Sequence, residues 1–305
     1  MNDTPGTTTD GIGAPSPSPA RSVQRRVALL AMLVAACALA YGLMLTRFDL
    51  SDGPLETELG QALGGRGVAL YLQPVHVDPV NSSMQMRISM VPGTVQGEAA
   101  AAIADRNLLL RIRRSRQVEH VTVGAGQPLP EVVFDFDLDG GDIRDYPLDR
   151  YEATLALAVS ERGADGVEAP LPIHVTLWEG LLGFSVRGQP APAQGPEAIG
   201  LSLEIRRTAA VSLFGIAMYG AMAVLAACAL LIGSLVFVAI RRIEVTFAGA
   251  LGAIIFALPA LRTALQGAPP LGVRGDVLIF FWAELGAIVA LCLFVAAWAR
   301  RGAQP

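Results

Sequence analysis

The sequence predicts an α+β membrane protein in which four transmembrane helices carry one inserted antiparallel β-sandwich domain. Hydrophobic residues make up 52% of the 305 residues and charged residues only 16%, whereas soluble domains carry about 25% charge. The apolar residues are concentrated in four runs, and a polar segment of alternating pattern separates the first run from the second. The net charge of −4 gives no reason to expect a nucleic-acid partner.

The four apolar runs are residues 27–46, 209–240, 245–261 and 277–298. The first has the roughly 20 residues that cross a hydrocarbon core of ~30 Å. The second is longer than one crossing needs, which predicts an outer stem above Tyr219 or a tilted helix. Pro259 is expected to mark the end of the third. Residues 1–26, rich in Thr, Ser, Pro and Gly, predict a disordered tail, and residues 299–305 form a second tail.

The placement of arginine predicts the orientation. Arginines precede the first run, fill the link between the second and third, and follow the fourth: Arg21, Arg25, Arg26, Arg241, Arg242, Arg300 and Arg301. Four crossings bring all of them to one side, which the positive-inside rule makes cytoplasmic. The sequence therefore predicts a multi-pass protein of the plasma (inner) membrane, with both termini cytoplasmic and residues 47–208 extracytoplasmic. Arg262 and Arg274 in the outer loop 262–276 are counter-evidence.

Two alternatives to an uncleaved first helix stay open. Ala38-Leu39-Ala40 resembles a signal-peptidase site, and Val34-Ala35-Ala36-Cys37 resembles a lipoprotein signal box. The apolar run continues past both sites to Leu45, which favours an anchor that stays in the membrane.

The polar middle of the chain reads as β-structure. Met84, Met86, Ile88 and Met90 alternate with polar residues, and Phe134, Phe136 and Leu138 alternate with aspartates. Short β-type runs at 154–159 and 173–178 and the alternation at 201–205 continue this pattern. About nine strands separated by Gly, Pro and Asp turns predict antiparallel sheets with one wet face and fit a β-sandwich. Residues 55–63 predict one short helix.

Two motifs carry a resemblance to a known family. One is Asp145-Tyr146-Pro147-Leu148-Asp149-Arg150-Tyr151, and the other is Pro270-Leu271-Gly272-Val273 with Phe280-Phe281-Trp282-Ala283-Glu284. Together with the order of helix, β domain and three helices, they resemble the uncharacterised bacterial membrane-protein family called domain of unknown function 4436. The family pattern is Tyr-Pro-Phe-Asp-x-Tyr, so Leu148 is a conservative departure. The resemblance covers about residues 27–300 and implies the topology, but no activity.

A fainter resemblance is to pentameric ligand-gated channels, whose β-sandwich has a Phe-Pro-Phe-Asp turn. Tyr146-Pro147-Leu148-Asp149, followed by Arg206-Arg207 before a helix, is similar in order. No cysteine flanks the turn, one helix precedes the domain, and three helices follow it where a channel has four.

Glu284 is the most conspicuous single residue because it lies within the fourth run, about 12 Å below its outer end. An acidic side chain at a helix centre costs about 2.5–3.5 kcal/mol on insertion, so Glu284 should face protein or water. It is either a structural hydrogen-bond partner of another helix or of Arg262, or an intramembrane ion or proton site. Gly220, Gly233, Gly249, Gly252 and Gly286 predict close helix packing.

Tyr146, Pro147, Asp149 and Tyr151 are expected to form a structural turn, because Pro fixes φ and Asp bonds nearby backbone N–H groups. By analogy with channels, this turn faces the loop 262–276. Asp276 is expected to cap the fourth helix. Trp282 is a candidate through the family resemblance alone.

The sequence offers no catalytic, cofactor-binding or metal-binding motif. Asp135-Phe136-Asp137-Leu138-Asp139-Gly140 matches the first half of a calcium loop, but Tyr146 stands where the bidentate Glu belongs. An amphipathic strand with its aspartates on the wet face explains the same residues.

These observations favour a non-enzymatic envelope protein without cofactor, whose outer β domain binds or positions a partner, such as another envelope protein, above the lipid bilayer. The alternative is a component of a channel or transporter that uses Glu284. The sequence does not indicate the oligomeric state.

Overall fold

The computed structural model describes residues 56–60, 67–92, 104–114, 117–193, 198–267 and 269–302, together with seven positions between 28 and 46. The chain divides into two compact units, residues 1–47 and 48–305. In the first unit, all seven described positions are helical: Ala28, Ala31, Met32, Ala35, Leu39, Gly42 and Thr46. The predicted tail 1–26, the rest of the predicted span 27–46 and Cys37 lie outside the described residues, as do residues 303–305.

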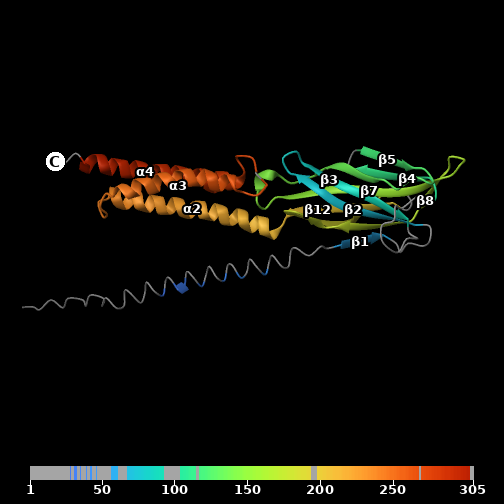
Figure 1. Ribbon diagram of the computed structural model, residues 1–305, viewed down its shortest axis with the longest axis horizontal. Coiled ribbons are helices and arrows are strands. Elements are labelled where there is room, and N and C mark those ends of the chain that lie inside the picture. The colour runs from blue at the N-terminus through green and yellow to red at the C-terminus, as the bar shows by residue number, and fades with distance from the viewer. Residues whose placement is uncertain are drawn as a thin grey trace, which may run out of the picture. The chain divides into compact units, whose positions relative to one another are not determined.

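The second unit begins with a β domain whose described residues form twelve strands in two sheets (Figure 1). The strands are β1 (Glu56–Gly60), β2 (Val68–Asp78), β3 (Ser83–Pro92), β4 (Leu108–Arg114), β5 (Gln117–Val123), β6 (Glu131–Asp137), β7 (Arg150–Arg162), β8 (Glu168–Leu171), β9 (Ile173–Trp178), β10 (Gly180–Leu181), β11 (Phe184–Ala191) and β12 (Ile199–Arg207). One sheet has the order β1-β9-β2-β3-β6, and the other has the order β10-β11-β12-β7-β4-β5, with β8 paired to β7. A short 3₁₀ helix, η1 (Ile143–Asp145), precedes β7.

The period-two pattern places the core as predicted. Met84, Met86, Ile88 and Met90 of β3 are buried, while the residues between them are more exposed. One apolar cluster joins them to residues of the other sheet such as Leu157. The alternation therefore works because the two sheets bury their apolar faces in a common core.

Two predictions about strand structure are wrong. The pairing of β2 with β9 is parallel, whereas all other strand pairs in the described residues are antiparallel. Residues 56–60, predicted as part of a helix over 55–63, form strand β1 on the outer edge of β9. Both errors have the same cause, because each of these strands pairs with β9, more than 90 residues away in the chain, and local pattern carries no information about such pairings.

Three helices in the described residues are long and apolar enough to cross a membrane, one fewer than the four spans predicted. They are α2 (Ala209–Phe237), α3 (Val245–Thr263) and α4 (Phe281–Gly302), which continues a π-helical turn, η2 (Asp276–Phe280). Pro259 lies inside α3 and does not end it. A proline so near the end of a helix removes only one hydrogen bond, and the helix runs on for four residues to Thr263.

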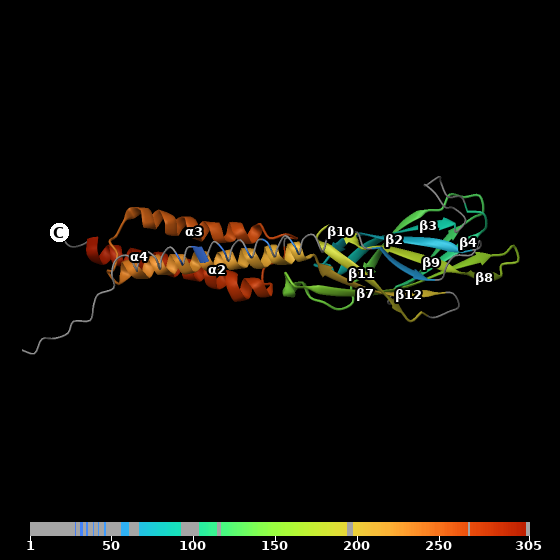
Figure 2. The ribbon, with the colours of Figure 1, turned by 90° about the horizontal axis from the view of Figure 1, so that it is seen from below.

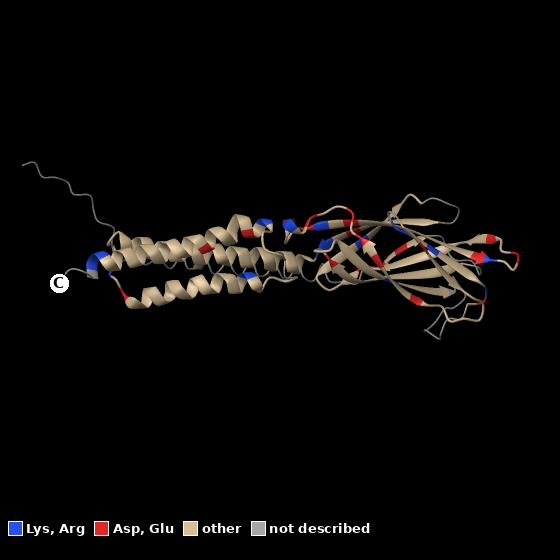
Figure 3. Ribbon diagram, turned by 90° about the horizontal axis from the view of Figure 1, so that it is seen from above, with Lys and Arg blue, Asp and Glu red and all other residues tan. Residues whose placement is uncertain are grey.

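The three helices lie side by side (Figure 2), and small residues bring α2 and α4 closest. A Cβ on Gly233 would stand 2.5 Å from the carbonyl oxygen of Ala290, and one on Gly286 would contact Leu230. Gly220, Gly249 and Gly252 have no described neighbour within 4 Å of such a Cβ, so the predicted close packing holds for two of the five glycines. Charged residues gather near the helix ends (Figure 3).

Candidate functional site at the junction of the β domain and the helices

The turn formed by Tyr146 and Pro147 lies against α2. Ser212 Oγ donates a hydrogen bond of 2.9 Å to the Pro147 carbonyl oxygen. A Cβ on Gly215 would stand 2.8 Å from Pro147 Cβ and 3.3 Å from the Tyr146 hydroxyl. The absence of a side chain at Gly215 therefore lets the turn rest directly on the helix backbone.

Asp149 and Arg207 form a buried ion pair at the base of the β domain. Arg207 Nε donates to Asp149 Oδ1 at 2.6 Å, and the two side chains are 3% and 0% exposed. Tyr151 donates its hydroxyl proton to the other carboxylate oxygen at 2.9 Å. Because a buried charge is costly unless it is paired and hydrogen-bonded, these contacts fix the three side chains together.

Arg207 also joins the β domain to the helical part of the chain. Its guanidinium carbon lies 4.6 Å from the centroid of the Tyr146 ring and 4.9 Å from that of Phe184, which is cation–π distance. On another side, a Cβ on Gly267 would stand 2.8 Å from Arg207 Nη1. The loop between α3 and α4 thus packs closely against Arg207, the last residue of β12.

Burial changes the acidity of the two tyrosines in this turn. Desolvation raises the pKa of Tyr146 above 10, and its hydroxyl is buried without a hydrogen-bond partner among the described residues. Desolvation also raises the pKa of Tyr151, and the neighbouring Asp149 carboxylate adds to the effect. Both side chains are therefore neutral and remain so well into the alkaline range.

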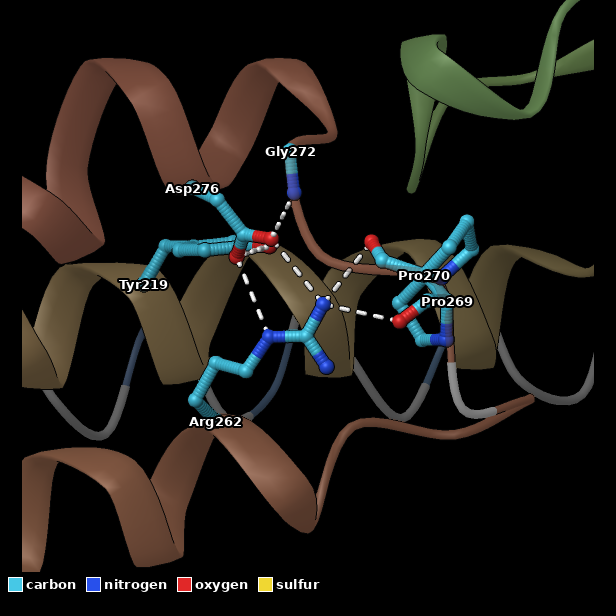
Figure 4. Close-up of polar contacts among 6 residues, drawn as sticks. All are labelled: Tyr219, Arg262, Pro269, Pro270, Gly272 and Asp276. Carbon is cyan, nitrogen blue, oxygen red and sulfur yellow. Dashed lines mark hydrogen bonds and ion pairs between the residues drawn. The ribbon is translucent and has the colours of Figure 1, made fainter.

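A second buried cluster occupies the end of the helices nearer the β domain and comprises Tyr219 of α2, Arg262 of α3 and Asp276 of η2 (Figure 4). Arg262 Nη2 and Asp276 Oδ2 are 2.9 Å apart, and the carboxylate is fully buried. Tyr219 donates to Asp276 Oδ1 at 3.0 Å. Arg262 Nη2 also donates to the carbonyl oxygens of Pro269 and Pro270. Arg262 and Asp276 together therefore tie the three helices and the loop between α3 and α4 to one another.

Asp276 does not cap its helix as predicted. The residue before the helical turn is Gly275, which makes no side-chain cap, and Asp276 accepts instead from the backbone N–H of Gly272 at 3.0 Å. The carboxylate is held by Arg262 of α3 and Tyr219 of α2 as well as by this loop N–H. The prediction identified a structurally important acid and assigned it the wrong partner.

The two clusters meet through the Tyr146 ring. This ring contacts Arg207 on the β-domain side, yet it belongs to the same apolar cluster as Tyr219 and other residues of the helices. At the surface, Arg274 pairs with Asp145 at 2.9 Å, so the turn also meets the loop 262–276, as the channel analogy suggested. Tyr146, Pro147, Asp149, Tyr151 and Asp276 thus share one junction.

Glu284 and Trp282 lie apart from this junction on α4. The Trp282 side chain is 67% exposed. Glu284 Oε2 is buried and has no hydrogen-bond partner among the described residues. The suggested bond between Glu284 and Arg262 is not formed, and Arg262 donates instead to Asp276 and to the carbonyl oxygens of Pro269 and Pro270.

Sequence reasoning missed Arg207, Arg262 and the two glycines at 215 and 267 as parts of the junction. Arg207 had a readable signal, because it continues the core-facing series of Leu203 and Ile205 in β12. An arginine in that phase needs a buried anion. Nothing local distinguishes Gly215 from Gly220, since the contact that requires a glycine comes from a distant turn.

The aspartates of the half calcium loop lie as the strand interpretation predicts. Asp135 and Asp137 are exposed on β6, and Phe134 and Phe136 are buried. Within the described ranges, no group of three or more His, Cys, Asp or Glu side chains is arranged to hold a metal ion.

Comparison with protein families gives two matches. The model of the domain of unknown function 4436 matches residues 58–205, and the model of the domain of unknown function 8686 matches residues 207–301. The motif of the last helix therefore belongs to the second domain, whereas the resemblance had placed it in the first. No curated protein matches the chain. The two matches are separated at Arg206, so Asp149 and Arg207 are matched by different family models although both lie in the β domain of the structure. The chain therefore carries a domain of unknown function 4436, as the resemblance predicted, followed directly by a domain of unknown function 8686.

Proposed function

We propose that this chain is a non-enzymatic envelope protein that holds an extracytoplasmic β domain in a fixed orientation relative to the membrane. In this orientation the domain positions a protein partner. The observation that carries the proposal is the junction, in which the Asp149–Arg207 pair is buried against both the β domain and the loop between α3 and α4. A flexible tether would need no such contacts. We further propose that the two sheets form a β-sandwich, supported by their common core.

The membrane topology in this proposal has four spans, with residues 27–46 as the first. The described helices support a location in the plasma (inner) membrane with their Arg-rich ends on the cytoplasmic side. Arg241, Arg242, Arg300 and Arg301 lie at one end of the helices, where the positive-inside rule expects them. Arg262 and Arg274, at the other end, are paired with Asp276 and Asp145. These two arginines therefore weigh little against the orientation.

Proximity labelling tests the positioning role. A peroxidase inserted in the exposed turn at Asp165-Gly166 should label a reproducible envelope protein in cells. The same enzyme inserted between Arg242 and Glu244 is the control and should label cytoplasmic proteins. Cytoplasmic labelling from the outer turn would overturn the orientation, and turnover of a substrate by the purified protein would overturn the non-enzymatic role.

A transport role is the second candidate, and Glu284 is the observation that favours it. Its Oε2 is buried with no hydrogen-bond partner among the described residues, on a helix apolar enough to cross a membrane, and an acid in such a place is often functional. If Glu284 is an ion or proton site, proteoliposomes should show a flux that Glu284→Gln abolishes and Glu244→Gln, in the exposed link, leaves intact. The absence of flux in the unaltered protein would remove this candidate.

A further inference from the structure

Four large aliphatic side chains protrude from turns around the outer ends of the helices. Their exposed fractions are 60% for Val80, 63% for Leu148, 100% for Leu182 and 71% for Leu271. Single exposed leucines are ordinary on protein surfaces. We call these four residues the tip residues. They come from four separate segments of the chain and gather at one place, and such clusters of exposed aliphatic side chains usually mark an interaction surface.

Hydrogen bonds fix two of the tip residues beside the first two turns of α2. The backbone N–H of Thr208 donates to the carbonyl oxygen of Gly183, next to Leu182, at 3.1 Å. Ser212 Oγ donates to the carbonyl of Pro147, next to Leu148. Both leucines therefore stand level with the start of the helix.

The other two tip residues lie at the same level. A shallow cavity is lined by Val80, Leu182, Arg207 and Gly267, which puts the β2–β3 turn next to the loop between α3 and α4. Leu271 is part of that loop and precedes Gly272, whose N–H is bonded to Asp276. All four tip residues thus surround the junction.

The length of α2 relates this level to the bilayer. Its 29 residues extend about 43 Å, which exceeds the ~30 Å hydrocarbon core and matches the roughly 40–45 Å of a bilayer with its headgroup layers. A helix that ends in the inner headgroup layer at Phe237 therefore starts in the outer one at Ala209. The tip residues, beside its first two turns, fall in the outer headgroup layer.

The surface between the hydrocarbon and the tip residues is apolar. Leu213 and Ile216 of α2 and Val277 and Leu278 of η2 are exposed on it. Ser212, the one hydroxyl among the first ten residues of α2, is turned to Pro147. Leu213, Ile216, Val277 and Leu278 thus extend the apolar surface of the helices toward the underside of the β domain.

Two exposed arginines at this level are neutralised by neighbouring aspartates. Arg274 pairs with Asp145 at 2.9 Å and Arg144 pairs with Asp142 at 2.5 Å. Arginines that are paired in this way gain little from anionic headgroups. Contact with lipid would therefore come from aliphatic side chains.

We propose that Val80, Leu148, Leu182 and Leu271 form a collar that dips into the outer leaflet and rests the β domain on the membrane, by apolar contact independent of lipid charge. The inference rests on the membrane anchoring proposed above. The collar would support the β domain in addition to the buried junction. A domain that touches the bilayer at several points around the start of α2 resists tilting.

Spin-label accessibility in proteoliposomes tests the collar. In full-length protein with Cys37, Cys228 and Cys292 replaced by Ala, a nitroxide is attached at Leu182→Cys or Leu148→Cys. The matched control is Val167→Cys, 64% exposed in the turn after β7, whose 13 residues carry it about 43 Å from the junction. A label at Val289→Cys, on the exposed face of α4, gives the reference accessibility for the hydrocarbon core.

The collar predicts a loss of accessibility to a water-soluble nickel complex and a gain in accessibility to oxygen at 182 and 148, relative to 167. The values should be the same in vesicles of phosphatidylcholine alone and with added phosphatidylglycerol. Nickel accessibility equal to that at 167, with position 289 in lipid, would overturn the collar and leave the anchoring intact. Nickel accessibility at 289 would overturn the anchoring itself. Labels at 182 and 148 shielded from both reagents would indicate a protein contact and would also overturn the collar.

Discussion

At the end of β12, Arg207 holds its guanidinium group among the rings of Tyr146 and Phe184 and the carboxylate of Asp149. Its backbone belongs to the β domain, and its side chain is covered by Gly267 from the loop between α3 and α4. Substitution here should affect both parts of the molecule, because the same side chain serves each of them.

We predict that Arg207→Met lowers the free energy of unfolding by about 3–5 kcal/mol, because the Asp149 carboxylate loses its cation while it stays buried. The double variant Asp149→Leu, Arg207→Met should recover most of that loss, since no charge is then buried. Chemical unfolding of the detergent-solubilised protein measures both. Arg144→Gln, at an exposed pair, is the control and should have no measurable effect. Equal losses in the single and double variants would show that the buried charge is not the cause.

The Tyr146 hydroxyl and ring should contribute differently. Because the hydroxyl has no partner in the described structure, Tyr146→Phe should change the stability by no more than about 1 kcal/mol. Tyr146→Ala should be far more damaging, since it removes the ring from Arg207 and from the apolar cluster of the helices. Thermal unfolding of the two variants beside the unaltered protein distinguishes ring from hydroxyl.

The raised pKa of Tyr146 also predicts a pH dependence. The folded protein keeps the proton that an unfolded chain releases near pH 10, so stability is full below pH 10 and falls as the pH rises above it. Tyr146→Phe should reduce the loss of stability above pH 10. The loss that remains should come from Tyr151, whose pKa is also raised. An unchanged slope in melting temperature between pH 9 and 11 would contradict the assignment.

Among the elements, α2 is one of the three described helices apolar enough to cross a membrane, and the Tyr146–Pro147 turn rests on it. Two glycines five residues apart on this helix allow a matched comparison, because Gly215 faces the turn and Gly220 has no described neighbour within 4 Å of an added Cβ. The helix itself gains stability from alanine at either position.

We predict that Gly215→Ala destabilises the protein, because its Cβ would stand 2.8 Å from Pro147 Cβ. Gly220→Ala should raise the stability by about 0.5–1 kcal/mol through helix propensity alone. Unfolding of the two variants under identical conditions gives the comparison. If both variants gain stability, the turn does not rest on α2 as described.

The sequence predicted those elements whose pattern is local. The alternation of Met84, Met86 and Ile88 identified β3, and the apolar runs identified α2, α3 and α4. It did not predict β1 or the parallel β2–β9 pairing, because those depend on partners far away in the chain. It found Asp149 and Asp276 as candidates but not their partners, since the pattern can show that Arg207 faces the core but not which acid, 58 residues away, it meets, and the same holds for Arg262 and Asp276 across 14 residues.

For the whole molecule, we propose that the β domain and the three described helices behave as one rigid body, joined where the Tyr146–Pro147 turn contacts α2 and where Arg207 contacts the loop between α3 and α4. The Asp149–Arg207 pair fixes the β-domain side of this junction, and the Arg262–Asp276 pair fixes the helical side. A domain that positions a partner above a membrane requires such rigidity, whereas a domain that searches for its partner requires a flexible stem.

Double electron–electron resonance between one label in each part measures this rigidity most directly. Val133→Cys on β6 and Phe256→Cys on α3 are both exposed and would be labelled in the cysteine-free protein in nanodiscs. We predict a single narrow distance distribution, which broadens when Asp149→Asn removes the charge that Arg207 requires. A broad distribution in the protein with Asp149 intact would contradict the account.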